Sequence, residues 1–205
     1  MCYRTRLNSD LGLIEKSFEA TFVEPDQYHP QEEINGYAYQ PYPVITDEDA
    51  THIVMAQWGL VPFWSKDDAI KKFTLNAKIE TLDQKPSYRN STDKRCLVIA
   101  DGYYEWQWLD SKGKQKQKYL IRPEGQEIFA LAGIYSYWKN PETRKDVQSF
   151  SIVTTEANEL MAKIHNTKKR MPVLLREADR TKWLSGKEYH DFAFPYEVEL
   201  YAEAI

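Results

Sequence analysis

The sequence predicts an α+β fold whose sheet is mixed or antiparallel. Runs rich in β-branched and aromatic residues, each bounded by turn residues, have the pattern of strands. They cover residues 52–60, 95–106, 118–123, 127–138 and 149–155. Helical patterns are fewer and do not alternate regularly with these runs, which argues against a parallel βαβ architecture. Because no linker is long enough to divide the chain, we expect one domain over residues 1–205.

The clearest helix is expected over residues 154–165, where apolar residues recur at helical spacing and Thr154 or Thr155 is the expected N-cap. A second is expected over 177–186, ended by Gly186, and a short one after Ser65.

Two segments are predicted to be loops. The lysine-rich segment 110–118 lies between two strand patterns and predicts a hairpin loop. Residues 26–49 are rich in Pro, Tyr and acidic residues and predict a loop with one short extended piece.

Composition excludes several classes of protein. A hydrophobic content of 42% and a charged content of 28% are typical of a globular chain. The net charge of −4 excludes a basic whole-surface field, so any nucleic-acid contact must come from a local patch. Only Cys2 and Cys96 occur, which indicates a reducing compartment rather than a disulfide framework.

No membrane-length apolar run, signal peptide or metal-ligand spacing is present, so we expect a cytoplasmic protein without membrane, metal or cofactor.

The cysteine directly behind Met1 has two interpretations. It can be a small hydrophobic residue near a frayed terminus. Alternatively, Met1 is removed, and Cys2 then carries a free α-amine beside its thiol. Their ordinary pKa values are about 7.7–8.0 and about 8.5, so we expect a useful fraction of each to be deprotonated near neutral pH.

Two further stretches hold candidate polar groups. Asn76 in TLNAKIET either caps a turn or is a site residue. Glu105 in ADGYYEW follows an Asp-Gly turn signal and lies among aromatic residues. Burial among rings raises the pKa of a carboxyl group, which would let it transfer protons at neutral pH. The alternative is an ordinary salt bridge at the protein rim.

His165 closes the predicted helix, where a helix C-terminus favours a protonated imidazole. Lys168, Lys169 and Arg170 follow it, and such cations can hold a phosphate. The alternative is a helix cap. Trp58 and Trp64 in QWGLVPFW either pack under a loop or form a platform for bases.

Taken together and in this order, the blocks resemble the SRAP family, the SOS-response-associated peptidases. The blocks are the Cys behind Met1, WGLVPFW, NAKIET, RCLVIADGYYEW and IHNTKKRMPVLL. Three positions depart from the family pattern. Lys78 replaces an arginine, four residues rather than one separate His165 from Arg170, and the YQPYPV loop lacks the usual Asn-x-x-Pro.

The resemblance implies a barrel-like, largely antiparallel mixed sheet with a positively charged groove, and covalent crosslinking to abasic sites in single-stranded DNA. It implies that Cys2 is the nucleophile and that Asn76, Glu105 and His165 assist. The expected DNA contacts are Arg4, Lys78, Arg89 and Arg170 for phosphates, and Trp58, Trp64 and Trp106 for the shape of the strand.

The expected chemistry is closure of a thiazolidine on the sugar aldehyde by the amine and thiol of Cys2, which Cys96 cannot perform. A monomer is sufficient to engage one strand. Two alternatives remain open: an N-terminal-nucleophile peptidase or amidase, and a non-catalytic single-strand binder.

Overall fold

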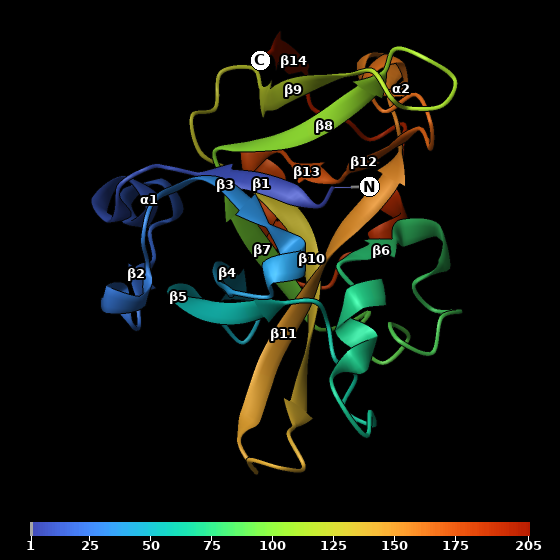
Figure 1. Cartoon of the computed structure of the whole chain (residues 1–205). Helices are drawn as coiled ribbons and strands as arrows, with labels where there is room; N and C mark the ends of the chain where they lie inside the picture. The colour runs from blue at the N-terminus through green and yellow to red at the C-terminus, as the bar shows by residue number, and fades with distance from the viewer. Residues whose placement is uncertain (1) are drawn as a thin grey trace.

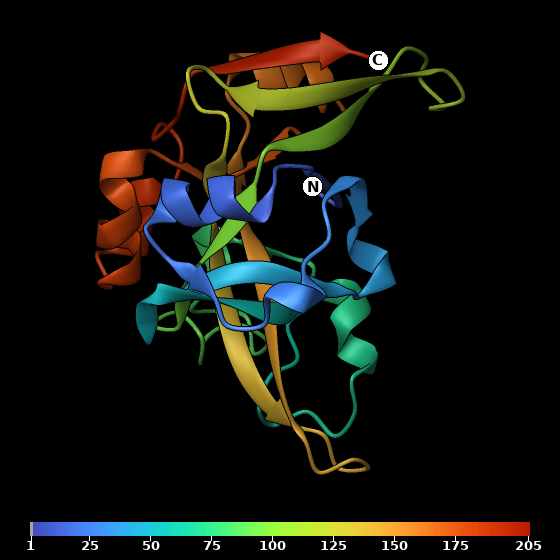
Figure 2. The same ribbon diagram turned by 90° about the vertical axis from the view of Figure 1, so that its left-hand side faces the viewer.

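The computed structural model describes residues 2–205. Its first sheet has the strand order β14-β9-β8-β1-β3, and its second has the path β12-β11-β10-β7-β4-β5-β2. An additional pairing between β5 and β11 closes the middle of this path into a barrel formed by β4, β5, β7, β10 and β11. The end of the first sheet formed by β14, β9 and β8 lies above the barrel in both Figure 1 and Figure 2.

The strands are β1 (Arg4–Leu7), β2 (Thr21–Phe22), β3 (Gln31–Asn35), β4 (Pro41–Thr46), β5 (Asp49–Trp58), β6 (Asn76–Lys78), β7 (Arg95–Ala100), β8 (Gly102–Trp108), β9 (Lys116–Pro123), β10 (Phe129–Lys139), β11 (Asp146–Glu156), β12 (Arg170–Pro172), β13 (Leu174–Leu175) and β14 (Leu200–Ala204). The α-helices are α1 (Leu11–Phe18), α2 (Glu159–Ile164) and α3 (Arg180–Leu184). The 3-10 helices are η1 (Pro25–Gln27), η2 (Gly36–Ala38), η3 (Ala69–Phe73), η4 (Ile79–Thr81), η5 (Glu177–Asp179) and η6 (Tyr189–Phe192).

The α+β class and the barrel-like mixed sheet are confirmed. Most barrel neighbours pair antiparallel, as β7 and β11 do on either side of β10. The closing pair is parallel, with Phe150 opposite Trp58. None of the helices within residues 2–205 is long and apolar enough to cross a membrane.

A glycine permits the closest approach inside the barrel. Gly133 lies opposite Cys96 across β10 and β7, and a Cβ atom at position 133 would come within 2.6 Å of the Cys96 sulfur. The indole nitrogen of Trp183 donates to the Cys96 carbonyl oxygen at 3.1 Å, which attaches α3 to this strand. Cys96 is thus a buried packing residue of the barrel.

The run expected as one strand over 95–106 is two strands that belong to different sheets. The break falls at Asp101, whose carboxylate accepts hydrogen bonds from Arg6, from the backbone and hydroxyl of Ser9, and from the backbone of Asn8. β7 remains in the barrel, whereas β8 pairs with β1 in the first sheet. This change of sheet moves Glu105 away from the barrel wall and toward the N-terminal strand.

The prediction of a loop over 26–49 is wrong, because this segment contains β3 and the interior barrel strand β4. Pro41 and Pro43 concealed β4, since proline cannot donate to a sheet ladder. Both precede Val44, where the pairing of β4 with β7 begins, so their missing N–H groups cost no bond on that side.

The helix predictions need three corrections. α2 begins at Glu159 with Asn158 as its N-cap, whose side chain accepts from the Met161 backbone at 2.9 Å. Thr154 and Thr155 instead belong to β11. The short helix expected after Ser65 is the 3-10 helix η3. α1, with Asp10 as its N-cap, was not expected.

Candidate functional site

The antiparallel ladder between β1 and β8 brings the N-terminal segment to Glu105. Thr5 pairs with Tyr103 and Arg6 with Gly102, so the chain that runs back from Thr5 to Cys2 follows β8 toward Glu105 (Figure 1). Cys2 is fully buried, and Glu105 is 5% exposed. After burial itself, the negative charge of Glu105 is the strongest influence that raises the pKa of the Cys2 thiol.

Asn76 holds the main chain of Cys2 in place. Its side-chain nitrogen donates to the Cys2 carbonyl oxygen at 2.8 Å. Asn76 is itself fixed by parallel pairing of β6 with β11 and by the Tyr88 hydroxyl, which donates to its carbonyl oxygen at 3.0 Å. The other side-chain atom, Oδ1, is buried and accepts no hydrogen bond from any residue in 2–205. Asn76 therefore holds Cys2 with one atom and keeps an acceptor unused.

Glu105 has a raised pKa, as the aromatic residues around it in the sequence predicted. Burial raises its pKa to about 7. The alternative of a salt bridge at the protein rim does not fit a carboxyl group that is 5% exposed. A group with this pKa exchanges protons readily at neutral pH.

The Cys2 thiol differs from expectation. Burial raises its pKa far above the ordinary value, and its sulfur approaches the Arg4 carbonyl oxygen at 3.8 Å. The thiolate fraction at neutral pH is therefore negligible in this environment, so the thiol needs an adjacent base in order to react. Met1 lies outside the described residues, and its removal stays a prediction.

His165 is a neutral imidazole in this structure, which corrects the expectation of a cation. Burial lowers its pKa to about 4. Its Nδ1 lies 2.8 Å from the Arg170 carbonyl oxygen and 3.4 Å from the Arg170 backbone nitrogen. The shorter contact favours the ring hydrogen on Nδ1, because a carbonyl only accepts. Any favourable effect of the end of α2 on a charged imidazole is outweighed by the loss of solvent.

The end of α2 is tied to β8, the strand that carries Glu105. The side-chain nitrogen of Gln107 donates to the Lys163 carbonyl oxygen at 3.2 Å. Asn166 accepts from the Trp108 backbone N–H at 3.2 Å and donates to the Trp108 carbonyl oxygen at 2.8 Å. These bonds hold the segment around His165 in register with the β8 strand.

Arg170 is not placed to bind a phosphate. Its guanidinium donates to both carboxylate oxygens of Glu80, at 2.8 and 2.9 Å, and to the Thr154 carbonyl oxygen at 2.8 Å. Arg170 is also buried. At its longer spacing from His165, Arg170 instead joins β12 to β11 and η4.

The prediction that Trp58 forms a platform for bases is wrong, because Trp58 is a core residue that is 1% exposed. Its ring stacks on Phe150 with centroids 6.1 Å apart, and its indole nitrogen donates to the Leu75 carbonyl oxygen at 2.9 Å. Trp64, by contrast, is 47% exposed. The two tryptophans of this motif therefore differ: Trp58 packs in the barrel core, whereas Trp64 keeps an exposed ring.

The remaining residues predicted to contact DNA differ in exposure and in whether a carboxylate already pairs with them. Lys78 and Arg89 are exposed and make no ion pair within residues 2–205. Arg4 is paired with Glu33 at 2.5 Å and lies 5.9 Å from the centre of the half-buried Trp106 ring.

Sequence reasoning missed the partner of Arg4. Glu33 also binds Lys118 at 2.6 Å, and the Lys118 ammonium lies 5.6 Å from the Trp106 ring. The three charged residues come from β1, β3 and β9, so only the order of strands in the sheet could have revealed them.

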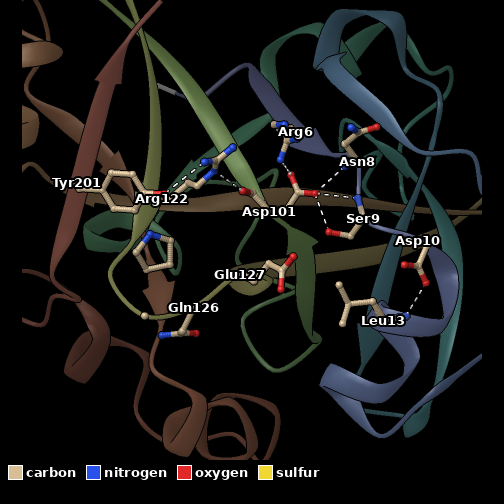
Figure 3. Close-up of a pocket in the computed structure, with 12 residues that line it drawn as sticks. Arg6, Asn8, Ser9, Asp10, Leu13, Asp101, Arg122, Gln126, Glu127 and Tyr201 are labelled. Carbon is tan, nitrogen blue, oxygen red and sulfur yellow. Dashed lines mark hydrogen bonds and ion pairs between the residues drawn. The ribbon is translucent and has the colours of Figure 1, made fainter.

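A cavity of about 750 Å³ lies at the other end of β1, and Cys2 does not line it. Figure 3 shows the Asp101 carboxylate inside it, surrounded by Arg6, Asn8 and Ser9. Since these groups satisfy the carboxylate, its role is to anchor the turn from β1 into α1. No three His, Cys, Asp or Glu side chains within residues 2–205 are grouped to hold a metal ion.

The chain is similar to known proteins in both sequence and fold. The sequence model described as SOS response associated peptidase (SRAP) matches residues 1–202. The chain is 36% identical over 189 residues to the abasic site processing protein YoqW of Bacillus subtilis, covering 91% of this chain and 81% of that protein. It is 33% identical over 169 residues to the abasic site processing protein HMCES of Gallus gallus, covering 69% and 48%.

Solved structures share the fold. A crystal structure of a protein from Bacteroides thetaiotaomicron superposes with a TM-score of 0.90 at 30% identity, covering all of this chain and 92% of that one. A protein from Bordetella bronchiseptica, at 20% identity and a TM-score of 0.83, covers 100% and 99% and shows the fold alone. The match of the family model over nearly the whole length means that this chain belongs to the SOS response associated peptidase (SRAP) family.

Proposed function

We propose that this protein binds single-stranded DNA and links covalently to abasic sites through Cys2 after removal of Met1, shielding the lesion for repair. The names of the relatives as abasic site processing proteins support this class of substrate. One observation carries the proposal: the carboxyl group of Glu105, with a pKa of about 7, acts electrostatically on the Cys2 thiol. Asn76 holds the main chain of Cys2 beside it by a hydrogen bond.

The proposed reaction begins with the open-chain aldehyde of an abasic deoxyribose. The α-amine of Cys2 adds to C1′, and Glu105 in its protonated form gives a proton to the hydroxyl group, which leaves as water. The resulting iminium carbon is then attacked by the sulfur, and the thiol proton passes to the Glu105 carboxylate. The product is a thiazolidine, and the balance is aldehyde plus aminothiol giving thiazolidine and one water.

The high pKa of the buried thiol makes Glu105 necessary twice in this scheme. The group must be protonated to remove the hydroxyl group and deprotonated to accept the thiol proton. A pKa of about 7 makes both forms accessible at neutral pH. Asn76 orients the Cys2 main chain, and its unused Oδ1 is available to accept from the amine or from a sugar hydroxyl.

The DNA strand would be held by groups that the fold leaves accessible. We assign Lys78 and Arg89 to phosphates and Trp64 and Trp106 to contacts with bases or the gap at the lesion. His165 takes part as a neutral group that gives or accepts hydrogen bonds, because its low pKa leaves it without charge.

The proposal is tested by mixing the protein with a single-stranded oligonucleotide that carries one abasic site, followed by a denaturing gel. A shifted band should require the abasic site and disappear in Cys2→Ala. Cys96→Ala should still crosslink, because Cys96 is a packing residue of the barrel. The mass of the adduct should equal protein without Met1 plus DNA minus one water. A crosslink that needs Cys96 and not Cys2 would refute the assignment.

The family description also names a peptidase activity, in which Cys2 would act as an N-terminal nucleophile on a peptide. Incubation with peptides and with the abasic oligonucleotide separates these activities. Single-strand binding that survives Cys2→Ala without any covalent product in the parent protein would leave only a binding role.

A further inference from the structure

A second cavity, of about 440 Å³, is lined by the chain neighbour of Cys2 and by the residue that hydrogen-bonds it. It is lined by Tyr3, Tyr37, Lys72, Phe73, Leu75 and Asn76. Tyr3 follows Cys2 in the chain, and Asn76 donates the hydrogen bond that holds the Cys2 carbonyl. The cavity therefore shares Asn76 with the candidate site, while Cys2 itself is buried behind these residues and does not line it. Its volume falls in the range of sites that bind small molecules, about 300–1,000 Å³.

The aromatic side chains of the cavity come from three separate parts of the chain. Tyr3 precedes β1, Tyr37 lies in η2 and Phe73 ends η3. The rings of Tyr3 and Tyr37 contact each other, with centroids 5.1 Å apart and planes tilted by 40°. Phe73 is 75% exposed, so its ring contributes little to the core. A phenyl ring held in solvent at the mouth of a cavity has an apolar surface to offer to a ligand.

The charge of the cavity is positive. The Lys72 ammonium lies 5.0 Å from the centre of the Phe73 ring and makes no ion pair with a residue in 2–205. Among residues 2–205, no carboxylate lines the cavity. Its neighbour Lys71, in contrast, is paired with Asp68. Aromatic faces together with an unneutralised cation are the features with which proteins bind a base and its phosphate in single strands.

Resting on the proposed function, we infer that this cavity binds the nucleobase of the nucleotide next to the abasic site. The lesion itself has no base, so the sugar bound at Cys2 leaves aromatic surface unused unless a neighbour supplies a ring. Successive nucleotides in one strand are about 3.4 Å apart along a duplex axis. Successive Cα atoms are about 3.8 Å apart, so Tyr3 lies within one nucleotide of Cys2. The base stacks on Phe73 and Tyr37, and Lys72 contacts the adjoining phosphate.

The test separates stacking from covalent chemistry by using an abasic analogue without an aldehyde. Oligonucleotides carry one tetrahydrofuran site with the fluorescent base 2-aminopurine on its 5′ or its 3′ side. Stacking quenches this base, so the parent protein should quench it on one side and not on the other. Replacing the quenched base by a second tetrahydrofuran should weaken binding by about fivefold or more, the low end of base–aromatic stacking.

Two variants and one control locate the effect. Phe73→Ala and Tyr37→Leu should each lose quenching and the preference for a neighbouring base, and Phe73→Ala removes an exposed ring whose loss leaves the fold intact. Tyr201→Ala is the matched control, because Tyr201 is also exposed but lies on β14, far from the segment that carries η3 in both views (Figure 1, Figure 2). It should quench as the parent protein does.

Each outcome distinguishes the two proposals. Unquenched 2-aminopurine on both sides, or unchanged quenching in Phe73→Ala, would overturn the base-binding cavity even where the true abasic oligonucleotide still crosslinks. Quenching that is lost in Phe73→Ala without any crosslink would retain the cavity and reject the chemistry at Cys2. Failure to bind any single strand would reject both.

Discussion

Replacing Glu105 by glutamine removes the titrating proton while keeping the shape of the neutral carboxyl group. The pKa of Glu105 is about 7 in the folded protein, against an ordinary value of 4.5. At about 1.4 kcal/mol per pKa unit, the folded state disfavours ionisation of this group by about 3 kcal/mol. We therefore expect Glu105→Gln to be more stable than the parent protein at pH 8 by up to about this amount.

The direction follows from proton binding in the two states. Below pH 4.5 the carboxyl group is protonated in both states, and its favourable contribution is fully present. As the pH rises from 4.5 to 7, the unfolded chain loses the proton first, so the free energy of unfolding falls. His165 acts oppositely between about pH 4 and 6.5, because its pKa is lowered from 6.5 to about 4. The difference between parent and variant isolates Glu105, since both proteins contain the histidine.

Urea unfolding of both proteins at pH 4.5, 6 and 8 measures this difference. The gap in unfolding free energy should grow with pH and level off above about 7. Glu142→Gln, on the exposed turn between β10 and β11, is the control for loss of a carboxyl group and should follow the parent protein. A gap that does not change with pH would refute the raised pKa of Glu105.

The same variant tests the chemistry. Single-turnover crosslinking by Glu105→Gln should be slower by roughly 10²–10⁴-fold, the usual contribution of general acid–base catalysis, with single-strand affinity unchanged. Equal rates for parent and variant across the pH range would return Glu105 to a structural role.

Three further perturbations follow from contacts in the structure. Glu33→Gln should release Arg4 and Lys118, raise affinity for single strands and steepen the dependence of log K on log salt by about 0.7 per phosphate gained; equal slopes in salt titrations would contradict this. The His165 ring should show no titration between pH 5 and 8 by NMR, and a midpoint above 6 would contradict its burial as a neutral group. Asp101→Asn should lower the free energy of unfolding by about 1.5–3 kcal/mol, since the carboxylate accepts from a guanidinium and from the backbone after β1; an unchanged urea midpoint would show that these bonds contribute nothing.

Four of the strands could be predicted from the sequence alone. The alternating and aromatic runs of β5, β9, β10 and β11 lie where expected, because side-chain periodicity and turn residues are local signals. β4 was missed because its prolines argue against a central strand, and only its pairing partners make them tolerable. The division of 95–106 at Asp101 was also hidden, since the groups that stabilise the break come from Arg6, Asn8 and Ser9, about 90 residues earlier in the chain.

In the candidate site, too, properties set by nearby sequence were predicted, and properties set by distant packing were not. The aromatic surroundings of Glu105 in its own strand were enough to predict a raised pKa. The charge of His165 was predicted wrongly because the helix end is a local feature, whereas burial is decided by the packing around it. Trp58 and Arg170 were misassigned for a related reason: an indole or a guanidinium has the same sequence signature whether its partner is DNA, Phe150 or Glu80.

Burial gives the site a property suited to the proposed reaction. It raises the pKa of both the Cys2 thiol and Glu105, so near pH 7 the thiol is neutral and Glu105 is half protonated. A neutral thiol beside a half-ionised carboxyl group repels an approaching phosphate backbone less than a carboxylate and a thiolate together would. The proposed dehydration then creates an iminium cation and a Glu105 carboxylate side by side. Opposite charges attract more strongly where water is excluded, so the burial that opposes either charge alone favours their formation as a pair.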